Sequence, residues 1–409
     1  MPSRPCFQTL TRLTLAAIAT ALAAAPALAQ SSPTPGAPSV PLLAPGLANG
    51  VQNRITYQHG IEFVTIGAPG NAPWAGNGTP GDIVIGRGSV NYEYRIGRYE
   101  ITTTQWVEFM NAAYDRPQSD WLPHLRPPDG GHWGAVATNP TVPGGLRWNV
   151  GAGQGLRGVG DISWRMAAMY CNWLHNDKST ARSAFLNGAY DVSTFGFHPS
   201  GIGFSDQLTH NANARFWIPT WDEWIKAAHY DPNKDGEGQG GYWLTPISQD
   251  ANITYGPPGM RVSNAVYPIV ADPNGPLAQA NSGWRDQFAG LDPWAIKLGA
   301  YADVAQSPWG LLDAAGGTDE WTETAEFFDI FPTTRFIEGS AWRESLGAAQ
   351  AGDILPTNGQ ASDFPSFALF NNGFRIAAAV PCGSSFVAFA VPTLAVGIRP
   401  RKRSKAPGC

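Results

Sequence analysis

The chain has 409 residues, of which 43% are hydrophobic and 14% are charged, so it can bury a large core. Its 47 Gly and 35 Pro predict many turns and ordered loops instead of a helical bundle, and its 16 Trp are large enough to fill the core between loops. Residues 1–29 and 380–409 carry seven of the 27 basic residues and no acid. The rest of the chain therefore has 20 Lys and Arg and 32 Asp and Glu, which gives it a net charge of −12. An acidic body argues against a nucleic-acid partner, because phosphate binding needs a basic face.

The first 29 residues have the organisation of a signal peptide. Two arginines precede an apolar run from 13 to 25, and Ala27-Leu28-Ala29 forms a small-residue cleavage site. A membrane anchor is the alternative, but the apolar run is short and ends at that site. We therefore expect residues 1–29 to be removed and the mature protein to be secreted or extracytoplasmic, with the cell surface as one destination.

Three further regions follow. Residues 30–54 are rich in Pro, Ser, Gly and Ala and are expected to form a linker, residues 55–380 a single domain, and residues 381–409 a short tail. The only cysteine in this domain is Cys171, so no internal disulfide framework is expected. A buried small hydrophobe and a reactive thiol are the two interpretations of that cysteine, and we favour the first.

The tail combines a Val-Pro turn, an apolar stretch at 386–398 and a basic end. Thirteen residues interrupted by Pro392 are too few to span a bilayer, which takes about 20, so we expect no stable transmembrane span. This order resembles the bacterial PEP-CTERM sorting tail in degenerate form, since Pro381-Cys382-Gly383 stands where the Pro-Glu-Pro signature would fall. The resemblance implies sorting by the tail or transient membrane contact.

Residues 59–73 and 92–102 alternate apolar and polar side chains and stop at Gly-rich turns, which predicts half-buried strands. Long Gly, Pro and Asn-rich segments follow at 127–160, 185–215 and 231–300. Loops of this length in a compact domain are ordered for a functional reason or held by ions.

Three helices are predicted from their N-terminal caps. Thr102 and Gln105 have the spacing of a capping box, and so do Thr220 and Glu223. Ser163 is expected to cap a third helix between them.

Five blocks in one order point to a family. They read YRIGRYEITTTQWVEFMN, ISWRMAAMYCNWL, FWIPTWDEWIKAAHY, PWGLLDAAGGTDEWTE and NGFRIA. Together they resemble the formylglycine-generating enzyme family, also called the sulfatase-modifying factor domain, over residues 55–380. The resemblance implies an α+β fold, a loop-rich variant of the C-type lectin fold with little regular secondary structure and with bound calcium.

The resemblance also implies an activity, which the sequence does not support. Characterised members oxidise a sulfatase cysteine to formylglycine with oxygen and a copper ion, held by two cysteines beside a Gly-Gly-Ser-aromatic strand. In residues 338–345, EGSAWRES, the first thiol position falls on Arg343 or Glu344, and the second on Ala348 or Ala349. Because Cu(I) prefers thiolate ligands, copper is not expected here.

Calcium is the cofactor that the resemblance leaves open. Asn281 and Asp286 match one family site, and they offer the oxygen ligands that calcium needs. At a second site Glu320 is kept, whereas Gly317 replaces the family's Asn. Ordinary surface carboxylates and turns are the alternative interpretation of all these positions.

Other chemistry is sparse. The seven histidines show no metal-binding spacing, and His175 and His229 lie at predicted helix ends, where the helix dipole explains them. Five acids cluster between 319 and 329, as a solvated face or an ion site: Asp319, Glu320, Glu323, Glu326 and Asp329.

The favoured function is an exported, non-catalytic binding or structural module that has lost the copper-binding cysteine pair and recognises an unknown ligand or a protein or glycan partner. The alternative is a formylglycine-generating-type oxidoreductase, or another enzyme that uses different residues of the same cleft, so the sequence leaves enzyme status open. The cleft candidates are Trp342, Arg343, Glu344, Asn372 and Arg375.

Overall fold

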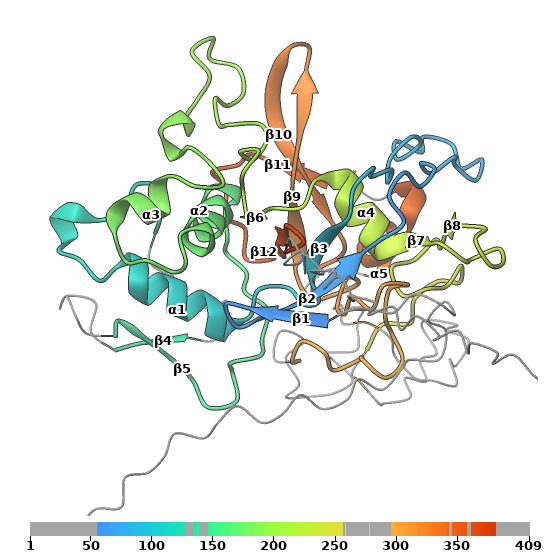
Figure 1. Ribbon diagram of the computed structural model, residues 1–409, viewed down its shortest axis with the longest axis horizontal. Helices are drawn as coiled ribbons and strands as arrows, with labels where there is room; N and C mark the ends of the chain where they lie inside the picture. Colours follow the sequence, from blue (N-terminus) through green and yellow to red (C-terminus); the bar gives the residue numbers. More distant parts are fainter. Residues whose placement is uncertain are drawn as a thin grey trace, which may run out of the picture. The chain divides into compact units, whose positions relative to one another are not determined.

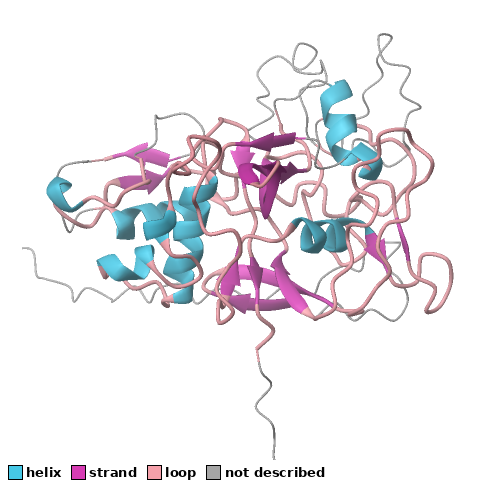
Figure 2. Ribbon diagram, turned by 90° about the horizontal axis from the view of Figure 1, so that it is seen from above, coloured by secondary structure: helices cyan, strands magenta, loops and turns pink. Residues whose placement is uncertain are grey.

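The computed structural model describes residues 55–126, 135–138, 146–256, 258, 278, 296–342, 346–357 and 361–381. The strands are β1 Ile55–Gln58, β2 Ile61–Ile66, β3 Tyr94–Gly97, β4 Ala135–Ala137, β5 Trp148–Val150, β6 Phe216–Trp217, β7 Tyr230–Asp231, β8 Gly241–Tyr242, β9 Asp319–Phe328, β10 Phe331–Glu338, β11 Ala361–Asp363, β12 Asn372–Gly373 and β13 Ala377–Ala378. The α-helices are α1 Thr103–Ala113, α2 Trp164–His175, α3 Arg182–Leu186, α4 Trp221–His229 and α5 Leu346–Asp353, and the 3-10 helices are η1 Gln118–Asp120, η2 Val192–Thr194 and η4 Leu355–Thr357. Figures 1 and 2 show these short elements joined by long loops, which confirms the predicted loop-rich α+β class.

A five-stranded antiparallel sheet joins the two ends of the described chain. Its order is β1-β2-β3-β13-β6, so the last strand lies between two much earlier ones. Ala377 of β13 is paired both with Ile96 of β3 and with Trp217 of β6. All four residues of β3 are buried, because this strand lies inside the sheet and is covered on both faces, whereas we predicted a half-buried strand.

A four-stranded sheet carries the long hairpin formed by β9 and β10. The order is β11-β10-β9-β12, with β12 parallel to β9 and the other pairs antiparallel. Glu320 faces Glu338 near the base of the hairpin, and Phe328 faces Phe331 at its end. The first five residues of β9 are buried and its last three are exposed, so this strand runs from the core into solvent.

The predicted helix starts are confirmed. Thr102 and Gln105 form a reciprocal capping box on α1, and Thr220 and Glu223 form another on α4. The Ser163 side chain accepts a hydrogen bond from the backbone N–H of the third residue of α2. Among the helices that the structure describes, none has the length and apolar content needed to cross a bilayer.

Aromatic side chains fill the core, as the Trp content predicts. The largest fully buried side chains include the tryptophans 106, 164, 173, 221, 224 and 321. Trp106 lies within 6 Å, centroid to centroid, of Phe109, Tyr170 and Phe374, which come from α1, α2 and the segment before β13. One continuous apolar cluster therefore connects the helices to the five-stranded sheet.

Protein groups order the long loop after α3. The Asn172 carboxamide of α2 donates to the carbonyls of Phe185 and Tyr190 and accepts from the Tyr190 N–H at 2.7 Å. Further along, Asp206 accepts two 2.8 Å hydrogen bonds from the buried Arg165 guanidinium. Side chains of α2 thus hold this segment in place.

Candidate functional site

Residues 339–342, the described part of the segment that aligns with the family's Gly-Gly-Ser-aromatic strand, form a turn held by hydrogen bonds to the rest of the domain. Gly339 has φ +77°, a conformation that favours glycine, directly after β10 ends at Glu338. The Ser340 hydroxyl donates to Asp353 at 2.9 Å, and the Trp342 N–H donates to the Gly317 carbonyl at 2.7 Å. Arg343 and Glu344 lie outside the described residues, so their part in a cleft stays a prediction.

Arg375 is buried in an ion pair. Its guanidinium donates to both oxygens of Glu320, and neither side chain is more than 1% exposed. It also donates to the carbonyls of Gly97 and Leu312, at 3.1 and 3.2 Å. Burial opposes the charge, but the Glu320 carboxylate raises the pKa of Arg375 above its ordinary value. Arg375 thus connects the segments that contain Gly97, Leu312 and Glu320, and this contact stabilises the fold.

The described cleft candidates meet along one short stretch, Gly317–Glu320. Trp342 bonds to its first residue, Asn372 of β12 pairs with Asp319, and Arg375 binds its last residue. All three candidates are buried. These three residues are therefore neighbours in the fold, and their use in binding or catalysis stays a prediction.

A glycine at 317 is explained by a carboxyl group beside it. Glu100 is buried and accepts hydrogen bonds from the Thr318 N–H and hydroxyl, at 2.9 and 2.8 Å. Gly317 has φ +84°, and a Cβ there would overlap this carboxyl. Burial, followed by the charge of Glu320, raises the pKa of Glu100 well above its usual range. Gly317 therefore leaves room for the buried carboxyl group of Glu100.

The calcium assignment of Glu320 does not fit its surroundings. Arg375 takes both carboxylate oxygens, and the Trp224 indole N–H donates to one of them at 2.8 Å. A carboxylate that already has three donors, one group of them a buried cation, is poorly placed to bind a second cation. Asn281 and Asp286 lie outside the described residues, so calcium at that pair stays a prediction.

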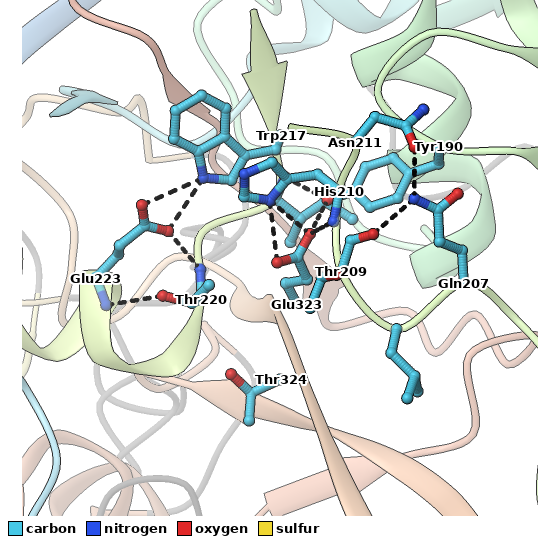
Figure 3. A network of polar contacts seen from close by, with 12 residues as sticks. Tyr190, Gln207, Thr209, His210, Asn211, Trp217, Thr220, Glu223, Glu323 and Thr324 are labelled. Atoms are coloured by element: carbon cyan, nitrogen blue, oxygen red, sulfur yellow. Dashed lines mark hydrogen bonds and ion pairs between the residues drawn. The ribbon is translucent and has the colours of Figure 1, made fainter. Parts of the chain in front are cut away.

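A second polar network, shown in Figure 3, surrounds Glu323 on β9. This carboxylate, 1% exposed, accepts from the Tyr190 hydroxyl at 2.7 Å, the His210 N–H at 2.7 Å and the His210 ring Nδ1 at 2.9 Å. The imidazole is 23% exposed and stacks on Trp217, with 4.6 Å between ring centroids. Glu323 thereby fixes the orientation of a partly exposed histidine, as an orienting carboxylate does in many acid–base sites.

A further buried carboxylate lies on the other side of the stacked rings. The Trp217 indole donates to Glu223 at 3.1 Å, and the Tyr92 hydroxyl donates to the same group at 2.9 Å. Burial raises the pKa of Glu223. Burial alone would lower the pKa of His210, but the hydrogen bond and charge of Glu323, together with the charge of Glu223, raise it above its ordinary value.

Sequence reasoning missed this network. His210 belongs to no motif, and its partner Glu323 is 113 residues away, so no local spacing could reveal the pair. Of the five clustered acids, Asp319, Glu320 and Glu323 are buried, and only Glu326 and Asp329 form the predicted solvated face. The sequence of β9 gives no apolar–polar alternation that would mark its buried face, because its first five residues are all buried.

The Cys171 thiol and the His229 imidazole are both buried. Burial raises the pKa of the Cys171 thiol well above its usual range, which agrees with the inert interpretation. Burial lowers the pKa of His229 to about 3, so this histidine is neutral and the predicted attraction of its charge to the helix dipole is wrong. Within the described part of the chain, no cluster of three or more His, Cys, Asp or Glu could hold a metal ion.

The sequence model of the family described as sulfatase-modifying factor enzyme 1-like domain matches residues 87–380. The chain belongs to this family, and the resemblance predicted from its blocks is confirmed.

Among solved structures, the chain is similar to Treponema denticola variable protein 1, with 17% identity, a TM-score of 0.42, and coverage of 80% of this chain and 99% of that one. It is also similar to CarF, with 16% identity, a TM-score of 0.43, and 78% and 98% coverage. PvdO from Pseudomonas aeruginosa has 12% identity, a TM-score of 0.40, and 80% and 98% coverage. No curated protein sequence matches this chain.

Proposed function

We propose that this protein is an exported, non-catalytic binding or structural module built on the sulfatase-modifying factor scaffold. The observation that carries the proposal is the thiol inventory of the domain. Cys171 is its only cysteine, and it is fully buried in α2. Formylglycine formation by the family mechanism takes two thiolates on copper, and one inert thiol cannot replace them.

The environment of the cleft candidates supports the same proposal. Arg375 directs its donors to Glu320 and to backbone carbonyls, and the Ser340 hydroxyl binds a buried aspartate. These side chains stabilise the scaffold that the family uses, and a scaffold by itself guarantees no chemistry. We expect export because residues 1–29 have the organisation of a signal peptide.

The test has two steps: an anaerobic Cu(I) titration of the mature chain against a chromophoric chelator, followed by incubation of the copper-treated protein in air with a peptide that carries the sulfatase cysteine motif. We expect no copper transfer to the protein and no peptide oxidation. Cys171→Ser should behave in the same way, whereas a variant with Glu344→Cys and Ala349→Cys provides a thiol pair as a positive control. Tight Cu(I) binding or peptide oxidation by the wild type would overturn the proposal.

A second candidate, catalysis by other side chains, is favoured by one observation. Glu323 bonds to Nδ1 of His210, and this leaves the partly exposed ring with Nε2 as its second nitrogen for proton transfer. A hydrolase or transferase of this kind should lose turnover on His210→Asn. Equal turnover by wild type and variant, on any ester or glycoside substrate found active, would exclude this role.

A further inference from the structure

The end of the β9–β10 hairpin exposes large apolar side chains on both of its faces. Phe327 is 51% exposed, Phe328 69% and Ile330 73%. Phe327 and Phe328 are adjacent on one strand, so they point to opposite faces. A flat protein partner would cover only one of these faces.

Two neighbouring segments extend this apolar surface. The loop 197–204 lies against the hairpin, because the Phe204 N–H donates to the Pro332 carbonyl at 2.9 Å and His198 packs on Phe331 with 5.1 Å between centroids. Figure 1 shows this loop, between α3 and β6, beside the hairpin. Its Phe197, 73% exposed, contacts Phe364 of the segment 364–369. Exposed apolar side chains on neighbouring segments mark an interaction site.

The charges of the surface restrict the partner. Segments 197–204, 326–332 and 364–369 contain no Lys or Arg, and the nearby Arg126 is engaged with the Ala368 carbonyl at 3.2 Å. The hairpin end instead carries two acids, Glu326 and Asp329. Glu326 is held on the hairpin by the hydroxyls of Thr334 and Ser362, both at 2.6 Å. Anionic bilayers attract basic surfaces, so we expect them to repel this acidic hairpin end.

We propose that the hairpin end, Phe327 to Ile330, inserts into the interface of a bilayer whose headgroups carry ammonium groups, such as phosphatidylethanolamine. The apolar side chains enter the boundary between headgroups and acyl chains, where aromatic rings are favoured. The Glu326 carboxylate lies at headgroup level and meets the ammonium charges, and Asp329, which forms the turn between β9 and β10 with Ile330, keeps the insertion shallow. A bilayer would surround the inserted hairpin end, and so it would cover the apolar side chains on both of its faces. This inference is independent of the function proposed above.

The test is cosedimentation of the full chain with vesicles of phosphatidylethanolamine and phosphatidylcholine, and with vesicles that also contain phosphatidylglycerol. Wild type is expected to bind the zwitterionic vesicles with little dependence on salt. The triple variant F327S/F328S/I330S should lose at least about tenfold in partition coefficient, a change worth about 1.4 kcal/mol. All variants contain the same C-terminal tail, residues 381–409. A difference in vesicle binding between wild type and the triple variant is therefore caused by the hairpin.

The matched control is L156S, which makes the same kind of change at an exposed leucine of another loop, and it should bind like wild type. D329K should shift the preference toward phosphatidylglycerol vesicles. Circular dichroism and urea unfolding should be unchanged in all variants, because the substituted side chains are exposed. Failure of wild type to bind zwitterionic vesicles, or equal binding by the triple variant, would overturn the proposal, and an unchanged preference of D329K would overturn the headgroup assignment.

Discussion

The domain buries carboxyl groups in two different ways. Glu320 has a cation, Arg375, in direct contact, whereas the described part of the chain gives Glu100 the N–H and hydroxyl of Thr318 as hydrogen-bond donors and no ion pair. A charged carboxylate away from water is tolerable next to a buried guanidinium, and without one the neutral form is favoured. The raised pKa of Glu100 follows from this difference.

Removing the charge of Glu320 should destabilise the fold strongly. Glu320→Gln leaves the Arg375 guanidinium buried without its counter-ion, and breaking such a pair costs about 3–5 kcal/mol. The free energy of unfolding, measured by urea denaturation, should fall by that amount.

The control for this change is Glu326→Gln on the same strand. Glu326 is exposed, so the free energy of unfolding should change by less than about 0.5 kcal/mol. Equal losses in the two variants would contradict a special role for the buried pair.

At the scale of elements, the segment 207–211 is tethered to the β9–β10 hairpin. His210 binds Glu323 of β9, while Arg335 of β10 donates to the Gln207 carbonyl at 2.7 Å and to the backbone carbonyl of Glu323. Two side chains from the hairpin, Glu323 of β9 and Arg335 of β10, and one from the loop, His210, thus hold this segment in place of regular secondary structure. Burial lowers the pKa of Arg335 to about 10, so this guanidinium remains charged at neutral pH.

The tether should depend on pH. The pKa of His210 is raised above its ordinary 6.5 in the folded chain, so the imidazolium stabilises the fold. This contribution is complete below about pH 6.5 and is lost as the pH rises through the folded-state pKa. The loss in unfolding free energy caused by His210→Asn should therefore be larger at pH 5.5 than at pH 9.

His198→Asn is the matched control, because that ring lies exposed against Ser200 and contacts no carboxylate among the described hydrogen bonds. Each comparison with wild type is made at one pH, so the other titrating groups cancel. A difference between wild type and His210→Asn that stays constant from pH 5.5 to 9 would refute the tether.

Local chemistry explains which elements the sequence predicted. Capping boxes join residues three apart, so Thr102 with Gln105 and Thr220 with Glu223 could be identified directly. The sheet order and the Glu323 network depend on partners more than 100 residues apart, and no alternation or spacing encodes those. Even Gly317, visible as a departure from the family pattern, is explained only once Glu100 is seen beside it.

For the whole molecule, the region before the family match is part of the core. The match begins at residue 87, yet β1 and β2 pair into the same sheet as β3. Phe63 and Ile66 of β2 are completely buried. The sulfatase-modifying factor domain of this chain therefore needs residues that the family pattern omits.

A chain that starts at Arg87 should fail to fold, because it exposes the core beneath β2. Near-UV circular dichroism of the tryptophans should be lost, and size-exclusion chromatography should show aggregation. A chain that starts at Leu43 is the control and should retain the wild-type spectrum. Native spectra from both chains would show that β1 and β2 are dispensable.

The position of β13 imposes an order on folding. Its two alanines lie between β3 and β6, so the backbone groups on one edge of each of those strands find their partners only when residues 377 and 378 are available. During synthesis the sheet can close only after residues 377 and 378 have been made, and until then it has two unpaired edges. Nascent chains that stop before residue 377 are thus the form of this protein most exposed to aggregation.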